Sequence, residues 1–149
     1  MGNPEFAIPS LNALITSEHE VAAVVTSPDR MMGRGRTLSS MPVAQRASEL
    51  DLRLIQPLTL TDSGFIASMS EIDADLFIVV AFKVLPEAIL QLPRLGSINL
   101  HPSMLPAYRG PAPLQRAIMN GEDKTAVSTF FISPAIDTGD LLISRPLVI

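Results

Sequence analysis

Short apolar runs alternate along this chain with segments of helical period, and that alternation is what most constrains the fold. Residues 20–27, 75–81 and 96–100 are compact apolar runs, and residues 126–132 and 140–149 form two later ones. Runs of this length are typical of buried strands. Helix-period segments lie between and around them, at residues 4–15, 40–50, 61–72, 86–91 and 111–120. The pattern predicts βαβ units and an α/β fold, a Rossmann-like, mainly parallel sheet flanked by helices.

Several of the expected helices carry recognisable start and stop signals. Ser40 is placed to act as an N-cap, with Pro42 in the first turn that follows it. Thr61 or Asp62 is placed to cap the next helix, and Asn120 followed by Gly121 predicts the end of the last one.

The composition predicts one globular domain and excludes several classes of site. Hydrophobic residues make up 47% of the 149 residues and charged residues 17%, enough apolar material for a sizeable core. The net charge of −4 gives no overall attraction to nucleic acid, so any RNA contact must come from a local basic cluster. The chain has no cysteine, and neither histidine has a partner at metal-ligand spacing, so no metal site is expected. No apolar stretch reaches the roughly 18 residues of a membrane span and no signal peptide is recognised, which predicts a cytoplasmic protein.

The segment NLHPSMLPAYRG, residues 99–110, holds the most informative polar residues. It directly follows an apolar strand, so Asn99 and His101 are expected at the carboxyl edge of the sheet, where open α/β sheets bind ligands. Residues two apart in a strand point the same way. An amide donor beside an imidazole suits acyl transfer, since one can stabilise an oxyanion and the other can move a proton. By spacing alone, a polar strand end without function is the stronger interpretation.

Two further segments gain interest only from their context. Asp137 and Asp140 flank Gly139 in the stretch AIDTGDL, which by itself predicts an Asx turn, although a carboxylate near His101 could fix its tautomer. Residues 29–36, DRMMGRGR, predict a flexible basic loop in which Arg34 and Arg36 could grip phosphates. A solvated surface loop is the competing interpretation, and charge alone does not separate the two.

The motifs taken together resemble a known family along nearly the whole chain. The matching stretches are GNPEFAIPSL, VVTSPDR, GRGRTLSSMPV, QPLTL, LPRLGSINLHPSMLPAYRGPAPLQRAIMNGE and IDTGDLL. The stretch around NLHPSMLP resembles the folate-dependent formyltransferase superfamily, and GRGR with YRGPAPLQ resembles its tRNA branch. Residues 1–149 are therefore expected to form a formyltransferase catalytic domain.

The resemblance implies formyl transfer from 10-formyltetrahydrofolate to the α-amino group of methionyl initiator tRNA. It assigns the catalytic roles to Asn99, His101 and Asp137. It implies that the folate lies against Phe82, Lys83, Val84, Leu85, Ser103, Met104, Leu105 and Pro106. It implies that Arg34 and Arg36 contact the tRNA acceptor arm. The complete protein is expected to be a monomer, and no metal is implied.

The resemblance also suggests a partial domain. The first strand, expected before Met1, the end of the catalytic domain and a C-terminal tRNA-binding barrel domain have no match in the chain, so low stability and weak or no activity are expected of this piece. Two alternatives remain open at this point. One is a relative that formylates a small amine, either a sugar nucleotide or glycinamide ribonucleotide, and the other is a folate-binding fragment without turnover.

Overall fold

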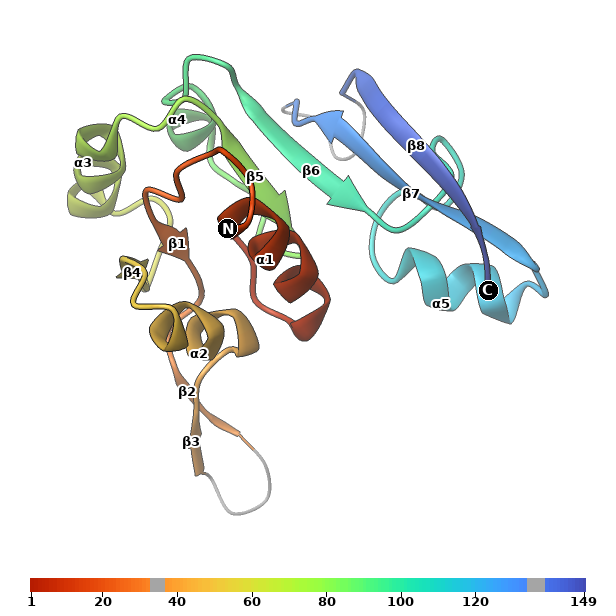
Figure 1. Ribbon diagram of the computed structural model, residues 1–149, viewed down its shortest axis with the longest axis horizontal. Helices are drawn as coiled ribbons and strands as arrows, with labels where there is room; N and C mark the ends of the chain where they lie inside the picture. Colours follow the sequence, from red (N-terminus) through yellow and green to blue (C-terminus); the bar gives the residue numbers. More distant parts are fainter. Residues whose placement is uncertain (33–36, 134–138) are drawn as a thin grey trace.

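The computed structural model describes residues 1–32, 37–133 and 139–149, and these form short sheets with helices on both faces (Figure 1). The largest sheet has four strands in the order β5-β6-β7-β8. Its strands are β5 (Phe77–Val80), β6 (Ser97–His101), β7 (Lys124–Phe131) and β8 (Leu141–Val148). β5 and β6 are parallel, whereas β6, β7 and β8 pair antiparallel. A second, parallel pair joins β1 (Val24–Val25) to β4 (Leu54–Ile55).

The helices begin and end close to where the sequence predicts. They are η1 (Glu5–Ala7), α1 (Ile8–Ile15), α2 (Pro42–Glu49), α3 (Ser63–Ile72), α4 (Glu87–Leu90) and α5 (Pro113–Met119). Asp62 caps α3 by accepting a bond from the Phe65 amide at 2.8 Å, as expected. The expectation that Ser40 caps α2 is wrong, because Met41 holds the N-cap position. The Ser40 hydroxyl donates instead to Asp29, at 2.7 Å.

Two hydrophobic cores cover opposite faces of the strands. Neighbouring residues in a strand point to opposite faces, and Val79 accordingly joins one core while Val80 joins the other. The first core packs β5 against α3 and α4, and it includes Phe65, Met69, Phe77, Val79 and Ile89. The second packs β1 and β5 against α1 and α2, and it includes Leu11, Val24, Val43, Ala47 and Val80. Helices on both faces of parallel pairs confirm the predicted α/β class.

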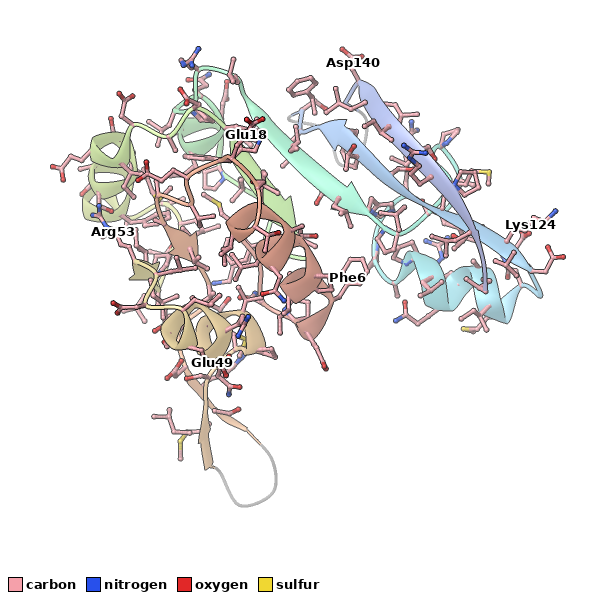
Figure 2. The ribbon with its side chains drawn as sticks, in the orientation of Figure 1. Phe6, Glu18, Glu49, Arg53, Lys124 and Asp140 are labelled. Atoms are coloured by element: carbon pink, nitrogen blue, oxygen red, sulfur yellow. The ribbon has the colours of Figure 1, made fainter. Side chains whose placement is uncertain are left out.

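Met1 and Gly2 connect the two sheets. The Gly2 amide donates to the Val25 carbonyl at 3.1 Å, and the Val80 amide donates to the Met1 carbonyl at 2.9 Å. Only a glycine fits there, because a Cβ on Gly2 would lie 2.8 Å from the Val80 carbonyl oxygen. Beside this connection lies a largely apolar groove of about 670 Å³, between the β1 and β5 segments, with Glu18 among its lining residues (Figure 2).

Arg30–Met32 forms a strand where the sequence predicts part of a loop. β2 (Arg30–Met32) pairs antiparallel with β3 (Thr37–Ser39), and the pair projects away from α2 (Figure 1). The connecting residues 33–36 lie outside the described part of the chain. In the described residues, no helix is long and apolar enough to cross a bilayer.

Candidate active site

Asn99 and His101 lie on β6 and share one face of the sheet, as the period-two pattern predicts. Across the parallel pair Asn99 lies opposite Val79, and across the antiparallel pair it lies opposite Phe130. His101 lies opposite Ser128. A buried residue of the core therefore supports Asn99 from each side, and His101 ends the strand at its carboxyl edge.

The His101 imidazole is buried and held by specific neighbours. Its side chain is 6% exposed. The Phe130 ring meets it edge-on, with the ring centroids 6.4 Å apart and an interplanar angle of 77°. Nε2 lies 3.1 Å from the backbone carbonyl oxygen of Tyr108. A ring fixed by packing and by a backbone acceptor keeps one orientation, which proton transfer at a defined atom requires.

The segment after His101 forms a closed turn over the end of β6. The Ser103 amide donates to the His101 carbonyl at 2.9 Å, and its hydroxyl donates to the Ala107 carbonyl at 2.8 Å. The Leu105–Pro106 peptide bond is cis. Of the predicted folate-contacting residues in this turn, Ser103 is buried and Leu105 half-buried, while Met104 and Pro106 are exposed.

The other predicted folate-contacting residues follow β5 at the same edge of the sheet. Leu85 is buried in the first core and Phe82 packs against that core, whereas Lys83 and Val84 are exposed. Because β5 and β6 are parallel, their carboxyl ends lie side by side. The structure therefore brings residues 82–85 to the edge that carries Asn99, His101 and the 103–106 turn.

Three predicted site residues cannot be placed beside the others. Asp137, Arg34 and Arg36 all lie outside the described residues. The structure describes β2 and β3, the strands before and after the two arginines. Asp29, which directly precedes β2, makes hydrogen bonds that hold this end of the pair. That carboxylate accepts bonds from Ser40 at 2.7 Å and from Gln56 at 2.9 Å. These bonds, the Ser40 bond first, lower the pKa of Asp29 below its usual value.

The large groove is separate from this candidate site. Its lining residues come from the β1, β5, α1 and α3 segments and include neither Asn99 nor His101. Strand edges and core side chains form the walls of this groove. Because the groove lacks Asn99 and His101, we assign the chemistry to the carboxyl edge of β6. Within the described residues, no three His, Cys, Asp or Glu side chains gather closely enough to hold a metal ion.

Sequence reasoning missed the residues that support the site. Ser128 and Phe130 lie opposite His101 and Asn99 only because of the β6–β7 register. Tyr108 belongs to the stretch YRGPAPLQ, but no sequence signal indicates that its carbonyl faces the histidine. The alternation in residues 126–132 could have indicated which side chains share a face, but not which strand they oppose.

Comparison with known proteins finds similar sequences along the whole chain. The family model described as formyl transferase matches residues 1–149. The methionyl-tRNA formyltransferase of Pelotomaculum thermopropionicum is 43% identical over 150 residues, covering 100% of this chain and 48% of that protein. The enzyme of that name from Bacteroides thetaiotaomicron is 46% identical over 142 residues, covering 95% of this chain and 44% of its own length. The chain thus spans about half the length of the curated relatives it matches.

Solved structures show the same fold at lower identity. The phosphoribosylglycinamide formyltransferase from Bacillus halodurans aligns with a TM-score of 0.77 at 19% identity, covering 99% of this chain and 77% of the other. A sugar N-formyltransferase from a Shewanella species aligns with a TM-score of 0.56 at 21% identity, covering 70% of this chain and 40% of the other. With the family model matched from end to end and relatives above 40% identity, this chain belongs to the formyl transferase family.

Proposed function

We propose that this chain carries the catalytic site for formyl transfer from 10-formyltetrahydrofolate to the α-amino group of methionyl initiator tRNA. The observation that carries the proposal is the pairing of Asn99 and His101 on one face at the carboxyl edge of β6. The names of the curated relatives support methionyl-tRNA as the acceptor.

Asn99 is suited to stabilise charge on the formyl oxygen. Its side chain is half-buried, and no side-chain hydrogen bond is recorded for it in the described part of the chain. The carboxamide N–H is thus available to donate as negative charge develops on the carbonyl oxygen under attack. One such donor typically lowers a barrier by roughly 3 kcal/mol.

His101 is suited to proton transfer. A free α-amine has a pKa of about 8, so a useful fraction is neutral and nucleophilic near neutral pH. The amine must lose a proton as its nitrogen bonds to carbon, and a buried imidazole beside the reacting atoms can accept it. We assign Asp137 the role of orienting His101 and stabilising its protonated form.

The residues around this edge fit a folate. No backbone hydrogen bond is recorded for residues 82–84 within the described chain, so their N–H and C=O groups are available to a heterocycle with donors and acceptors of its own. Leu85 and Leu105 offer apolar surface on either side. When bound, the folate supplies the formyl group as the electrophile. The bond from the formyl carbon to the folate nitrogen would break as the bond to the amine forms, and that nitrogen would take up the proton released by the amine, so tetrahydrofolate is the leaving group. We assign the tRNA acceptor arm to Arg34 and Arg36, because guanidinium groups bind phosphates well.

Replacement of the histidine tests this proposal. His101→Ala is expected to lower the rate of formyl transfer to methionyl-tRNA by at least about 100-fold, the usual effect of losing a general base. Folate affinity, measured separately by fluorescence titration, should change little because His101 is not among the residues assigned to the folate. His19→Ala is the matched control, since His19 is exposed and is not among the residues assigned to the site. Near-normal turnover by His101→Ala would show that the assigned role is wrong.

The same assay identifies the acceptor. Methionyl-tRNA, a free sugar amine and glycinamide ribonucleotide are each offered with the formyl donor. Transfer to the tRNA alone supports the proposal, whereas transfer to a small amine alone assigns the chain to a different branch. Folate binding with no transfer to any of the three would indicate a binding fragment.

A further inference from the structure

Gln56, in the stretch QPLTL, makes two directed contacts that the proposed site does not use. Its side-chain Nε2 donates to the Ser27 carbonyl at 3.1 Å and to Asp29 Oδ1 at 2.9 Å. A carbonyl and a carboxylate only accept hydrogen bonds, and the NH₂ group of a carboxamide supplies two donors. Gln56 therefore uses its N–H groups to join the end of β4 to the segment that leads from β1 to β2.

One side of this contact belongs to the framework of the β1–β4 pair. Gln56 directly follows β4, and the Ile55 carbonyl accepts a bond from the Thr26 amide at 3.0 Å. Ser27 is buried, and Asn3 binds it twice. Asn3 Oδ1 accepts from the Ser27 amide at 2.8 Å, and Asn3 Nδ2 donates to the Ser27 hydroxyl at 3.1 Å. Gln56 and Ser27 are thus both tied to the parallel strands.

The other side of the contact is the base of the β2–β3 hairpin, formed by Arg30–Met32 and Thr37–Ser39. Asp29 directly precedes this hairpin and Ser40 directly follows it. The Ser40 hydroxyl donates to Asp29 Oδ2 at 2.7 Å, so one oxygen of the carboxylate closes the base while the other accepts from Gln56. Hydrogen bonds to an ionised acceptor are stronger than those between neutral groups.

The hairpin projects away from α2, so its direction depends on what holds its base (Figure 1). Two other side-chain contacts recorded at this base, among the described residues, are longer. Arg30 Nη2 lies 3.9 Å from Met41 Sδ, and Gln45 Nε2 lies 3.4 Å from the Ser40 carbonyl oxygen. Hydrogen bonds of ordinary strength between nitrogen and oxygen are about 2.7–3.2 Å long. Gln56 therefore makes the short link between the hairpin base and the β1–β4 framework.

We propose that Gln56 is a positioning residue that sets the direction of the β2–β3 hairpin, and through it the affinity for the tRNA acceptor arm. The inference rests on the proposed function, because Arg34 and Arg36, which we assign to the acceptor arm, lie in the sequence between β2 and β3. Gln56 acts through Asp29, at the base of the hairpin. Loss of its contacts should therefore weaken tRNA binding and leave folate binding unchanged.

The direction of the hairpin can be measured without turnover. The chain has no cysteine, so spin labels can be attached at Leu38→Cys on β3 and Ala67→Cys on α3, both at exposed positions. Pulsed electron paramagnetic resonance then gives the distribution of distances between the labels. Gln56→Leu removes the N–H donors, and Gln56→Glu removes them while keeping the size of the side chain. Each variant should broaden the distribution by about 1.5-fold or more, because a hairpin without its link samples more directions.

Gln91→Leu is the matched control. Gln91 Nε2 also donates to a carboxylate at 2.9 Å, that of Glu87 in α4, away from the hairpin. This variant should keep the distance distribution of the unchanged chain. The inference is overturned if both Gln56 variants, folded by the criterion of unchanged circular dichroism, also keep that distribution.

Equilibrium binding of methionyl initiator tRNA gives the second readout. Both Gln56 variants should weaken this binding by about three- to tenfold, since a smaller fraction of hairpins points in the binding direction. Folate affinity, from fluorescence titration, should stay the same, which a general loss of structure would not allow. A broader distance distribution with unaltered tRNA affinity would also overturn the inference.

Failure of this inference and failure of the proposed function give different results. Formyl transfer to methionyl-tRNA, with tRNA affinity that does not respond to Gln56, would leave the proposed function intact and overturn the inference alone. An unchanged chain that binds no tRNA would contradict the proposed function and the effect on affinity together. The distance measurement would then still decide whether Gln56 sets the direction of the hairpin.

Discussion

Phe130 belongs to the core and to the candidate site at once. It is 2% exposed, it lies opposite Asn99 in the β6–β7 register, and its ring meets His101 edge-on. Phe130→Ala should lower the free energy of unfolding by about 3–5 kcal/mol, because a cavity replaces a buried ring. Urea denaturation measures this, and Phe6→Ala is the control, since Phe6 is 42% exposed. Similar losses from both variants would contradict the packing role of Phe130.

Single residues also show how far the site could be predicted from sequence. The shared face of Asn99 and His101 follows from the two-residue period of a strand, and the structure confirms it. The contacts of His101 with Phe130 and with Tyr108 do not follow, since the first needs the strand register and the second needs the path of a turn. The roles of Asp137, Arg34 and Arg36 stay predictions, because all three lie outside the described residues.

At the scale of elements, long periodic segments were predicted better than short ones. The five helix-period segments all contain helices, whereas the expected strand at residues 20–27 pairs only at Val24–Val25. A strand forms its ladder only where a partner reaches it, and that partner, Leu54–Ile55, has too few residues to produce a sequence pattern. The sequence does not predict the β2–β3 pairing, because Arg30–Met32 and Thr37–Ser39 have only three residues each, too few to show a regular alternation.

The base of that hairpin gives a prediction for an element. Asp29→Ala removes the acceptor for Ser40 and Gln56, so β2 should open locally while the cores stay intact. Limited proteolysis with trypsin is expected to cut after Arg30 at least about tenfold faster, as follows from local unfolding without global unfolding. Asp75→Ala is the control, because that exposed carboxylate pairs with Arg94 away from the hairpin. An unchanged cleavage rate at Arg30 in Asp29→Ala would count against the proposed anchoring.

At the scale of the whole molecule, residues 1 and 2 lie between β1 and β5. Met1 and Gly2 form the backbone link between them, and the groove of about 670 Å³ lies beside that link. Figure 2 shows that the β7–β8 pair extends beyond this region, with Lys124 and Asp140 near its opposite ends. The β1–β5 connection therefore rests on the shared cores and on hydrogen bonds of residues 1 and 2, including one from the Met1 amino group.

In a chain whose first residue is Met1, the α-amino group of Met1 makes the free energy of unfolding depend on pH. It donates to the Ile78 carbonyl at 2.6 Å, and burial lowers its pKa from 8.0 to about 5. Between about pH 5 and pH 8 the unfolded chain therefore binds a proton that the folded chain does not, so the free energy of unfolding should rise as the pH increases across this window. A tenfold change in proton affinity is worth about 1.4 kcal/mol, which makes the full effect at most roughly 4 kcal/mol.

Urea denaturation at several pH values measures this pH dependence of the free energy of unfolding. N-terminal acetylation removes the titrating group, and the acetylated chain should lose this part of the pH dependence. The same slope before and after acetylation would mean that other groups cause it and that the Met1 amine is accessible to water in the folded chain.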